Sequence, residues 1–530
     1  MADICLLVEG AYPYVLGGVS AWLHALISNL PDLTFSLLSI GTRPEHRQAA
    51  LYRLPDNVVE FREVFINDAR RLKKHRIAKR VSPTWDTFHT LHEAVALGKT
   101  YDSATLQPLL CESGFAGLTA SDLFHGRASW KLLVRLYELY APQMAFADFF
   151  WTFRFTYLPV FTIFETLLPQ AQVYHAVSTG YSGLLGALAK IRTGRPFIIT
   201  EHGLYTRERE IEIAQATWMD QPASLHDISK QRMGYFQEWW LNIYRFMEKI
   251  AYDSADSIIS ITAINQRYQL AHGADPEKAR VIPNGIDIGR LENLREQGAL
   301  VADAAYSAST ANGTAIPVVD IQQAALQPIP QNGASRPFLV GFVGRVVSIK
   351  DVKTFIRAIK IAQQMIPDLT SYIIGPTEEE PAYFQECRRL IELLNLEMII
   401  HFTGSVDVRT YYSKLDVLVL TSLSEGQPLV ILEGNCAGLP VIATDVGACR
   451  ELLMGISPED QALGESGIIT FVASPQQTAN AIIQLWRDED LRLKMGRAGQ
   501  KRVRRFYRQE QLYHAYDELY RHYMTQAFFV

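Results

Sequence analysis

Apolar residues in the C-terminal half fall into short continuous runs, and each run is followed by a segment with helical spacing. Runs of this length are typical of strands buried on both faces of a parallel sheet. The pattern predicts strands at 337–344, 369–375, 398–403, 416–421 and 440–443, and helices at 351–365, 381–394, 408–414 and 430–437. Repeated strand–helix units with short loops predict a doubly wound Rossmann-like domain over 337–505, followed by a C-terminal helix at 506–530 that could pack back on the first domain.

The same alternation occupies the N-terminal half, but a long helical stretch interrupts it. Strands are predicted at 3–8, 33–40, 171–178, 196–200, 257–262 and 280–283, with 207–210 in a loop. Because the stretch at about 65–168 is mostly helical, we interpret it as an insertion in an α/β domain that covers 1–285.

A change in composition separates these two regions. Residues 296–336 are rich in Ala, Ser, Gln, Asn and Pro and contain few aromatic side chains. Such a segment cannot bury enough apolar surface to offset its conformational entropy. We therefore predict a poorly ordered insertion or linker at 286–336, and a chain of 530 residues is in any case too long for a single core.

Charge and cysteine content narrow the class of protein. The formal net charge of −5 gives no electrostatic case for nucleic acid, and the basic clusters at 70–76 and 501–505 are expected to be solvated helix faces. The five cysteines lack a C-x-x-C pair, which favours a reducing compartment over a disulfide framework or zinc site. Charged residues interrupt the apolar region 144–168 before it reaches the ~20 residues of a membrane span. We expect a cytoplasmic protein and leave peripheral attachment to an inner membrane open.

Two carboxylates stand at the end of a predicted strand in the second domain. Glu425 follows the apolar run 416–421, and Glu433 lies about two turns further on in the next helix. Ligands of parallel sheets bind beyond the carboxyl ends of the strands. A carboxylate there can accept hydrogen bonds from the hydroxyls of a ribose or a hexose. The alternative is a strand-end turn with two solvated glutamates.

Arg345 and Lys350 flank the loop between the first strand and the first helix of this domain. Burying a diphosphate requires compensating cations, and each charge-assisted hydrogen bond is worth about 1.5–3 kcal/mol. The same two cations would stabilise a departing nucleoside diphosphate. The alternative is a pair of solvated surface cations.

In the first domain, Gly17 and Gly18 separate a strand from a helix, an arrangement in which backbone N–H groups can meet an anion. His202 follows the strand 196–200 and is therefore expected at the ligand-facing edge of the first sheet. The alternative for His202 is a hydrogen-bonded edge histidine with no chemical role.

Taken together, several motifs resemble the family 4 glycosyltransferases. They are Gly17-Gly18, Asn284-Gly-Ile-Asp287, Gly344-Arg345 with Lys350, Glu425-x7-Glu433 and Gly438-Leu-Pro-Val441. The resemblance implies the GT-B architecture, in which two doubly wound Rossmann-like domains face a central cleft. It also implies a nucleotide-sugar site made of Gly18, Arg345, Lys350, Glu425, Gly426, Leu429 and Glu433, with catalytic contributions from Glu425, Lys350, Arg345 and His202. One departure is Gln427-Pro428, where many members have an aromatic and a small residue.

The resemblance further implies a retaining hexosyltransferase. In that reading Glu433 binds the ribose, and Glu425 positions the donor sugar without covalent attack. The donor would be UDP-N-acetylgalactosamine, UDP-N-acetylglucosamine or UDP-glucose, the acceptor a growing polysaccharide, and inner-membrane export proteins could be partners. We expect no cofactor and no metal, because the only D-x-D string, at 488–490, lies in a helical tail. The alternatives are a UDP-sugar 2-epimerase of the same architecture and a catalytically silent scaffold of a membrane export complex.

Overall fold

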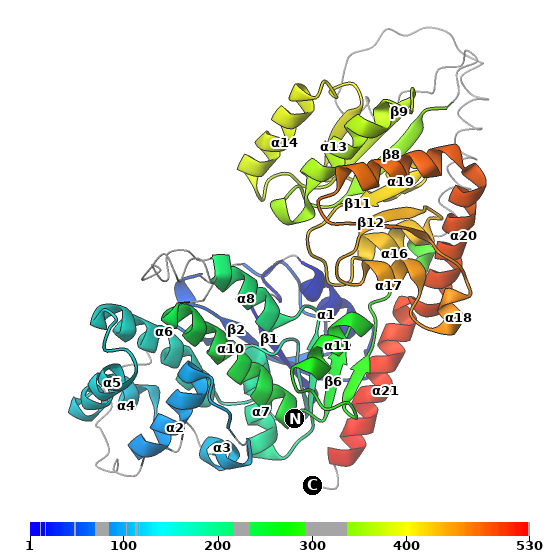
Figure 1. Cartoon of the computed structure of the whole chain (residues 1–530). Coiled ribbons are helices and arrows are strands. Elements are labelled where there is room, and N and C mark those ends of the chain that lie inside the picture. Colours follow the sequence, from blue (N-terminus) through cyan, green and yellow to red (C-terminus); the bar gives the residue numbers. More distant parts are fainter. Residues whose placement is uncertain are drawn as a thin grey trace. The chain divides into compact units, whose positions relative to one another are not determined.

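The computed structural model describes residues 1–527 except 11, 16, 47–48, 69–83, 102, 112–114, 116, 216–233 and 292–335. The chain divides into two compact units (Figure 1). Unit 1 comprises residues 1–261, 265–282 and 513–530, and unit 2 comprises 262–264 and 283–512. Most of the predicted linker and the basic cluster at 70–76 lie outside the described residues.

Unit 1 is built on a seven-stranded parallel sheet with the strand order β3-β2-β1-β4-β5-β6-β7. The strands are β1 (Ala2–Glu9), β2 (Phe35–Gly41), β3 (Val58–Phe65), β4 (Ala171–Ala176), β5 (Phe197–Glu201), β6 (Ser257–Ser260) and β7 (Ala279–Val281). The central strands are buried on both faces, as their continuous apolar runs predict. The sequence pattern missed β3, an edge strand in which polar and apolar residues alternate.

Helices pack against this sheet, and a group of helices inserted between β3 and β4 enlarges unit 1. They are α1 (Gly18–Ser28), α7 (Tyr181–Thr193), α8 (Tyr205–Gln215), α10 (Tyr235–Ser254) and α11 (Ala263–Ala271), with the inserted helices α2 (Thr84–Leu97), α3 (Ser103–Leu110), α4 (Ala120–Phe124), α5 (Arg127–Tyr140) and α6 (Phe146–Phe164). The inserted helices share one apolar core with α7 and α10. The loop predicted at 207–210 is wrong, because these residues lie inside α8, where charged side chains occupy exposed positions.

Unit 2 has a six-stranded parallel sheet with the order β10-β9-β8-β11-β12-β13. Its strands are β8 (Phe338–Val343), β9 (Leu369–Ile374), β10 (Ile400–Gly404), β11 (Val417–Leu420), β12 (Val441–Thr444) and β13 (Gly467–Thr470). Its helices are α13 (Val352–Gln363), α14 (Pro381–Leu393), α15 (Arg409–Tyr412), α16 (Leu429–Cys436), α17 (Cys449–Met454), α18 (Pro458–Gln461), α19 (Pro475–Arg487) and α20 (Glu489–Phe506). The final helix, α21 (Gln509–Ala527), begins in unit 2 and continues in unit 1 from Tyr513.

Both sheets therefore have the doubly wound Rossmann-like order, and the fold class is that of the GT-B glycosyltransferases. In such a sheet the chain order reverses between two central strands, and ligands bind beyond their carboxyl ends. The reversal falls between β1 and β4 in unit 1 and between β8 and β11 in unit 2. No helix in the described part of the chain has both the length and the hydropathy that crossing a bilayer requires.

Candidate functional site

The reversal point of unit 2 brings Lys350 and Glu425 together. Strands β8 and β11 pair directly, and the loops after them carry Lys350 and Glu425. The Lys350 ammonium lies 2.5 Å from Oε1 of Glu425, and the two side chains are 18% and 9% exposed. Residues 75 positions apart thus form a largely buried ion pair where the fold class places ligands.

Short hydrogen bonds between the two loops hold this pair in place. The Leu423 N–H donates to the Ile349 carbonyl at 2.8 Å, and the Thr421 hydroxyl donates to the Asp351 carbonyl at 2.9 Å. The Ser422 hydroxyl donates to the same Glu425 oxygen that meets Lys350. The ion pair is therefore fixed by neighbours on both sides before any ligand arrives.

Arg345 does not share a partner with Lys350. Its guanidinium pairs with Glu379, from the loop after β9, at 2.5 Å, and both side chains are about half exposed, at 51% and 52%. Exposed pairs of this kind are worth at most about 1 kcal/mol. A phosphate could therefore replace Glu379 at little cost, whereas the Lys350–Glu425 pair is shielded from solvent.

Glu433 lies in the second turn of α16, as the sequence spacing predicts. The hydroxyl of the buried Tyr412 donates to Glu433 Oε2 at 2.8 Å. Burial raises the pKa of Glu433, and this hydrogen bond opposes the rise. Because a carboxylate offers about four lone-pair positions, Tyr412 leaves capacity for two further hydroxyl donors.

A glycine that sequence reasoning missed closes the glutamate loop. Gly447 has a φ of +50°, and a Cβ there would overlap the Glu425 carbonyl oxygen. The next N–H, of Ala448, donates to the Gly426 carbonyl at 2.9 Å. Leu429 is the first residue of α16 and is partly exposed. The available signal was a glycine four residues after a predicted strand.

The Gln427-Pro428 departure from the family pattern has a structural role. Gln427 is buried, its Oε1 accepts from the Asn284 N–H at 2.8 Å, and its Nε2 donates to the Asn284 carbonyl at 3.3 Å. This amide exchange ties the Asn284-Gly-Ile segment to the loop that carries Glu425. An aromatic residue could not make both bonds.

In unit 1, Gly18 begins α1 and Gly17 caps it without a side-chain hydrogen bond. His202 directly follows β5, and its ring lies edge-on to Trp22 of α1 with centroids 4.4 Å apart. Burial lowers the pKa of His202 to about 4, so the ring is neutral at pH 7. Its Nε2 has no hydrogen-bond partner among the described residues.

The sequence reasoning also missed two glutamates at the carboxyl ends of strands in unit 1. Glu9 ends β1 at the reversal point, accepts from the Tyr205 hydroxyl at 2.8 Å and faces the N–H groups that begin α7. Glu201 ends β5 and accepts hydrogen bonds from Thr179, Tyr252 and Gln269. Only the burial of these carboxylates distinguishes them from solvated strand-end glutamates, and burial is not visible in the sequence.

Glu9 makes the two reversal points electrostatically different. The start of α7 is one of the two helix N-termini at the reversal point of unit 1, and a carboxylate of the chain already faces it. In unit 2 the corresponding point holds the ammonium of Lys350. Of the two, unit 2 is the one whose reversal point suits a phosphate.

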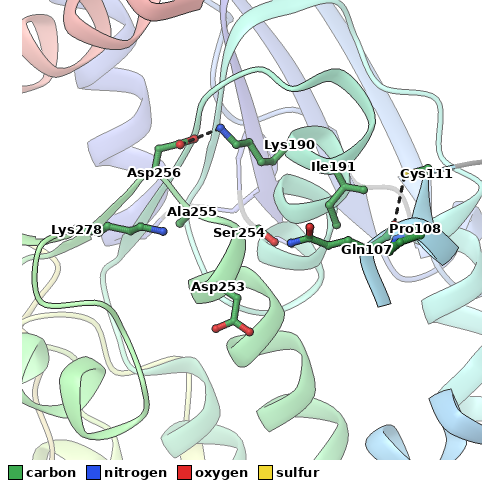
Figure 2. Close-up of a pocket in the computed structure, with 10 residues that line it drawn as sticks. All are labelled: Gln107, Pro108, Cys111, Lys190, Ile191, Asp253, Ser254, Ala255, Asp256 and Lys278. Carbon is green, nitrogen blue, oxygen red and sulfur yellow. Dashed lines mark hydrogen bonds and ion pairs between the residues drawn. The ribbon is translucent and has the colours of Figure 1, made fainter. Parts of the chain in front are cut away.

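A hollow of about 530 Å³ lies elsewhere in unit 1 (Figure 2). It is lined by the last turns of α7 and α10 and by the residues just before β6, and Lys190 pairs there with Asp256 at 2.8 Å. These segments mark the amino ends of the strands, opposite to the ligand-binding edge. None of the predicted site residues lines this hollow.

The D-x-D string at 488–490 starts α20. The Asp488 side chain accepts from the Leu491 N–H at 2.8 Å, so it caps the helix. Among the described residues, no three His, Cys, Asp or Glu side chains gather where they could hold a metal ion.

Two family models match the chain. Residues 2–277 match the model described as a domain of unknown function (DUF3492), and residues 337–488 match the model described as glycosyl transferases group 1. A D-inositol 3-phosphate glycosyltransferase of Thermomonospora curvata is 24% identical over 62% of this chain and 66% of its own length. The capsular polysaccharide biosynthesis glycosyltransferase CapM of Staphylococcus aureus is 25% identical over 36% and 47%. These matches thus span about half to two thirds of those relatives.

Solved structures resemble the chain over nearly its whole length. HepE of Anabaena in complex with UDP has a TM-score of 0.54 at 15% identity, covering 98% of this chain and 99% of HepE. Sucrose-phosphate synthase of Thermosynechococcus elongatus has a TM-score of 0.55 at 17% identity, covering 99% and 100%. At these identities the likeness concerns the fold. The chain therefore belongs to the family described as domain of unknown function (DUF3492), and residues 337–488 in its second unit match the model described as glycosyl transferases group 1.

Proposed function

We propose that this chain is a retaining glycosyltransferase that moves a hexose or N-acetylhexosamine from a UDP-sugar to a growing polysaccharide. The observation that carries the proposal is the shielded Lys350–Glu425 pair at the reversal point of a group 1 glycosyltransferase domain. The complexes of HepE with UDP and with UDP and glucose support a uridine nucleotide as the donor's leaving group.

Lys350 would neutralise the diphosphate of the donor. A phosphate close to Glu425 alone would be repelled, but the ammonium held by Glu425 has three N–H donors and can serve both groups. Arg345 would exchange Glu379 for a phosphate oxygen, because its present pair is exposed and weak. Both cations would then stabilise the charge that grows on the leaving diphosphate.

The two glutamates would bind neutral hydroxyls. Glu433, held by Tyr412, would accept from the ribose, and Glu425 would accept from the donor sugar. We assign Glu425 to positioning and charge stabilisation, because Lys350 and Ser422 already occupy one of its oxygens. In unit 1, the neutral imidazole of His202 is the side chain to which we assign a catalytic contribution.

A narrower proposal concerns the polymer. The segments Glu9–Trp22 and Thr200–Arg209 resemble PelF, the glycosyltransferase of bacterial Pel exopolysaccharide synthesis. The similarity to CapM, a capsular polysaccharide enzyme, is in keeping with a polysaccharide acceptor. UDP-N-acetylgalactosamine, UDP-N-acetylglucosamine and UDP-glucose are the donors to test first.

The direct test measures UDP release and sugar transfer with each donor, with and without an oligosaccharide acceptor. Lys350→Ala should abolish transfer. Lys353→Ala is the matched control. Lys353 lies three residues after Lys350 but pairs with Glu386 of α14, so this variant should remain active. Equal activity in the two variants would refute the role of Lys350. Conversion of the donor to its C2 epimer without acceptor would indicate the epimerase, and absence of nucleotide binding would indicate the scaffold.

A further inference from the structure

Five neighbouring aromatic side chains of α5 and α6 are at least partly exposed, and we call them the aromatic patch: Trp130, Phe146, Phe150, Trp151 and Phe155. Ring contacts connect Trp130 to Phe146 at 5.7 Å, Phe150 to Trp151 at 5.2 Å, and Trp151 to Phe155 at 5.6 Å between centroids. Phe146 and Phe150 are one helical turn apart. The side chains of Trp130, Trp151 and Phe155 are 53%, 50% and 45% exposed.

Phe146 and Phe150 are half-buried against the core of unit 1, but the exposure of Trp130, Trp151 and Phe155 is not explained by that core. The same helix, α6, already turns Phe149 and Phe153 inward, where they are fully buried. From Thr156 to Phe164 every residue of α6 is buried, so only its first turns carry exposed aromatics. Contiguous exposed apolar surface of this kind marks an interaction site.

Basic side chains border the aromatic patch. A hollow of about 650 Å³ is lined by Trp130 and Phe150 and also by Arg127 and Lys131. Arg135 is exposed one turn further along α5. Exposed acids on the two helices are Glu138 of α5 and Asp148 of α6.

The charge on this surface is therefore positive. The two helices carry the basic residues Arg127, Lys131, Arg135 and Arg154 against the acids Glu138 and Asp148. Figure 1 shows α4 and α5 at the end of unit 1 that lies away from its sheet, so a large flat partner could reach them.

We propose that the aromatic patch is a docking surface for an anionic lipid bilayer. Tryptophan and phenylalanine are the side chains that enter the interface between headgroups and acyl chains. Lys and Arg beside them reach lipid phosphates while their stems lie along apolar surface. Each cation near an anionic leaflet strengthens binding about fivefold. A neutral polysaccharide would also stack on aromatic rings, but it would gain nothing from the cations.

Flotation of the full chain with vesicles tests this inference without reference to glycosyl transfer. We expect the wild-type protein to float with phosphatidylcholine vesicles that contain phosphatidylglycerol, and to bind pure phosphatidylcholine much less. The double variant Trp151→Ala/Phe155→Ala should reduce the partition coefficient at least about tenfold, because two side chains lose their apolar burial. Lys131→Gln should reduce it about fivefold and weaken its dependence on salt.

Two control variants test whether the loss of any exposed ring or any exposed cation has the same effect on vesicle binding. Phe471→Ala removes a ring that is 68% exposed in unit 2, and Lys494→Gln removes an exposed cation of α20. Both should bind vesicles like the wild type. The proposal is overturned if the wild type fails to bind anionic vesicles, if binding is equal without phosphatidylglycerol, or if Trp151→Ala/Phe155→Ala binds unchanged. Loss of soluble polysaccharide binding in that variant, with vesicle binding intact, would assign the patch to the polymer.

Discussion

Glu9 and Glu425 both lie at the carboxyl ends of central strands, yet their surroundings differ. Glu425 meets an ammonium, whereas Glu9 meets a phenol hydroxyl and backbone N–H groups. Burial raises the pKa of Glu9, and its hydrogen bonds and the charge of Arg209 offset this rise only in part. The partner of each carboxylate therefore makes the two reversal points electrostatically different.

The buried carboxyl of Glu201 leads to a prediction about the pH dependence of stability. Burial and the nearby Glu248 carboxylate raise the pKa of Glu201 to about 7, above the usual value of about 4.3. Between these two pKa values, Glu201 holds a proton in the folded chain that it has released in the unfolded chain. Its contribution to stability is therefore fully present at low pH and is lost as pH rises through about 7. The side chain of the Glu201→Gln variant stays neutral at every pH. Between about pH 5 and 8 this variant should therefore lose on the order of 2 kcal/mol less unfolding free energy than the wild type.

Urea unfolding followed by tryptophan fluorescence measures this slope, because seven of the eight tryptophans lie in unit 1 and only Trp486 lies in unit 2. The control is Glu238→Gln, an exposed glutamate of α10. If Glu201→Gln and the wild type lost stability equally with rising pH, the carboxyl of Glu201 would not be the titrating group.

At the scale of elements, the geometry of unit 2 depends on loops that follow parallel strands. The sequence pattern predicted β8, β11 and α16, because their apolar runs are continuous and their ends are marked by polar residues. It missed β13, a four-residue strand at the edge of the sheet, although Ile468 and Ile469 form a short apolar run there. Short and edge elements depend on neighbours that a single sequence does not display.

Gly447 tests the contact between two of these loops. Gly447→Ala combines a left-handed backbone, which costs about 1–2 kcal/mol, with a methyl group against the Glu425 carbonyl. It should destabilise unit 2 and weaken UDP binding. Gly464→Ala has the same backbone penalty, at φ +88°, but nothing lies within 4 Å of the new methyl. Calorimetric UDP titration should distinguish them, and equal affinity in both variants would contradict the contact.

At the scale of the whole molecule, α21 contributes buried tyrosines to unit 1. The Tyr516 hydroxyl lies 2.8 Å from the Thr200 hydroxyl, and the Tyr520 hydroxyl lies 2.7 Å from His175 Nδ1. Both tyrosines are fully buried. Each lies more than 300 positions along the chain from its partner, Thr200 or His175. The sequence predicts a helical tail, but hydrogen bonds across such separations follow only from the assembled fold.

Tyrosine replacements quantify this contribution. Tyr516→Phe removes one hydroxyl and should cost about 1 kcal/mol of unfolding free energy. Tyr516→Ala also leaves a cavity and should cost about 3–5 kcal/mol. His514→Ala, at an exposed position of the same helix, should be nearly neutral. Urea unfolding by tryptophan fluorescence measures all three, and a neutral Tyr516→Ala would show that α21 does not support unit 1.

The limits of sequence reasoning follow from the same contacts. Lys350, Glu425 and Glu433 could be found because each stands at a fixed distance from a recognisable strand. The separate pairing of Arg345 with Glu379 could not be foreseen, because Glu379 comes from the loop after a different strand. The strand order that makes β8 and β11 neighbours is likewise a property of the folded sheet.

Calorimetric titration of the full chain with UDP tests whether the reversal point of unit 2 binds a nucleoside diphosphate. We expect saturable one-to-one binding by the wild type. Lys350→Ala should weaken it at least about tenfold, the loss expected when a charged hydrogen bond to phosphate is removed, while Lys353→Ala should bind like the wild type. Absence of UDP binding by the wild type, or equal affinity in the Lys350→Ala variant, would show that Lys350 does not hold the diphosphate.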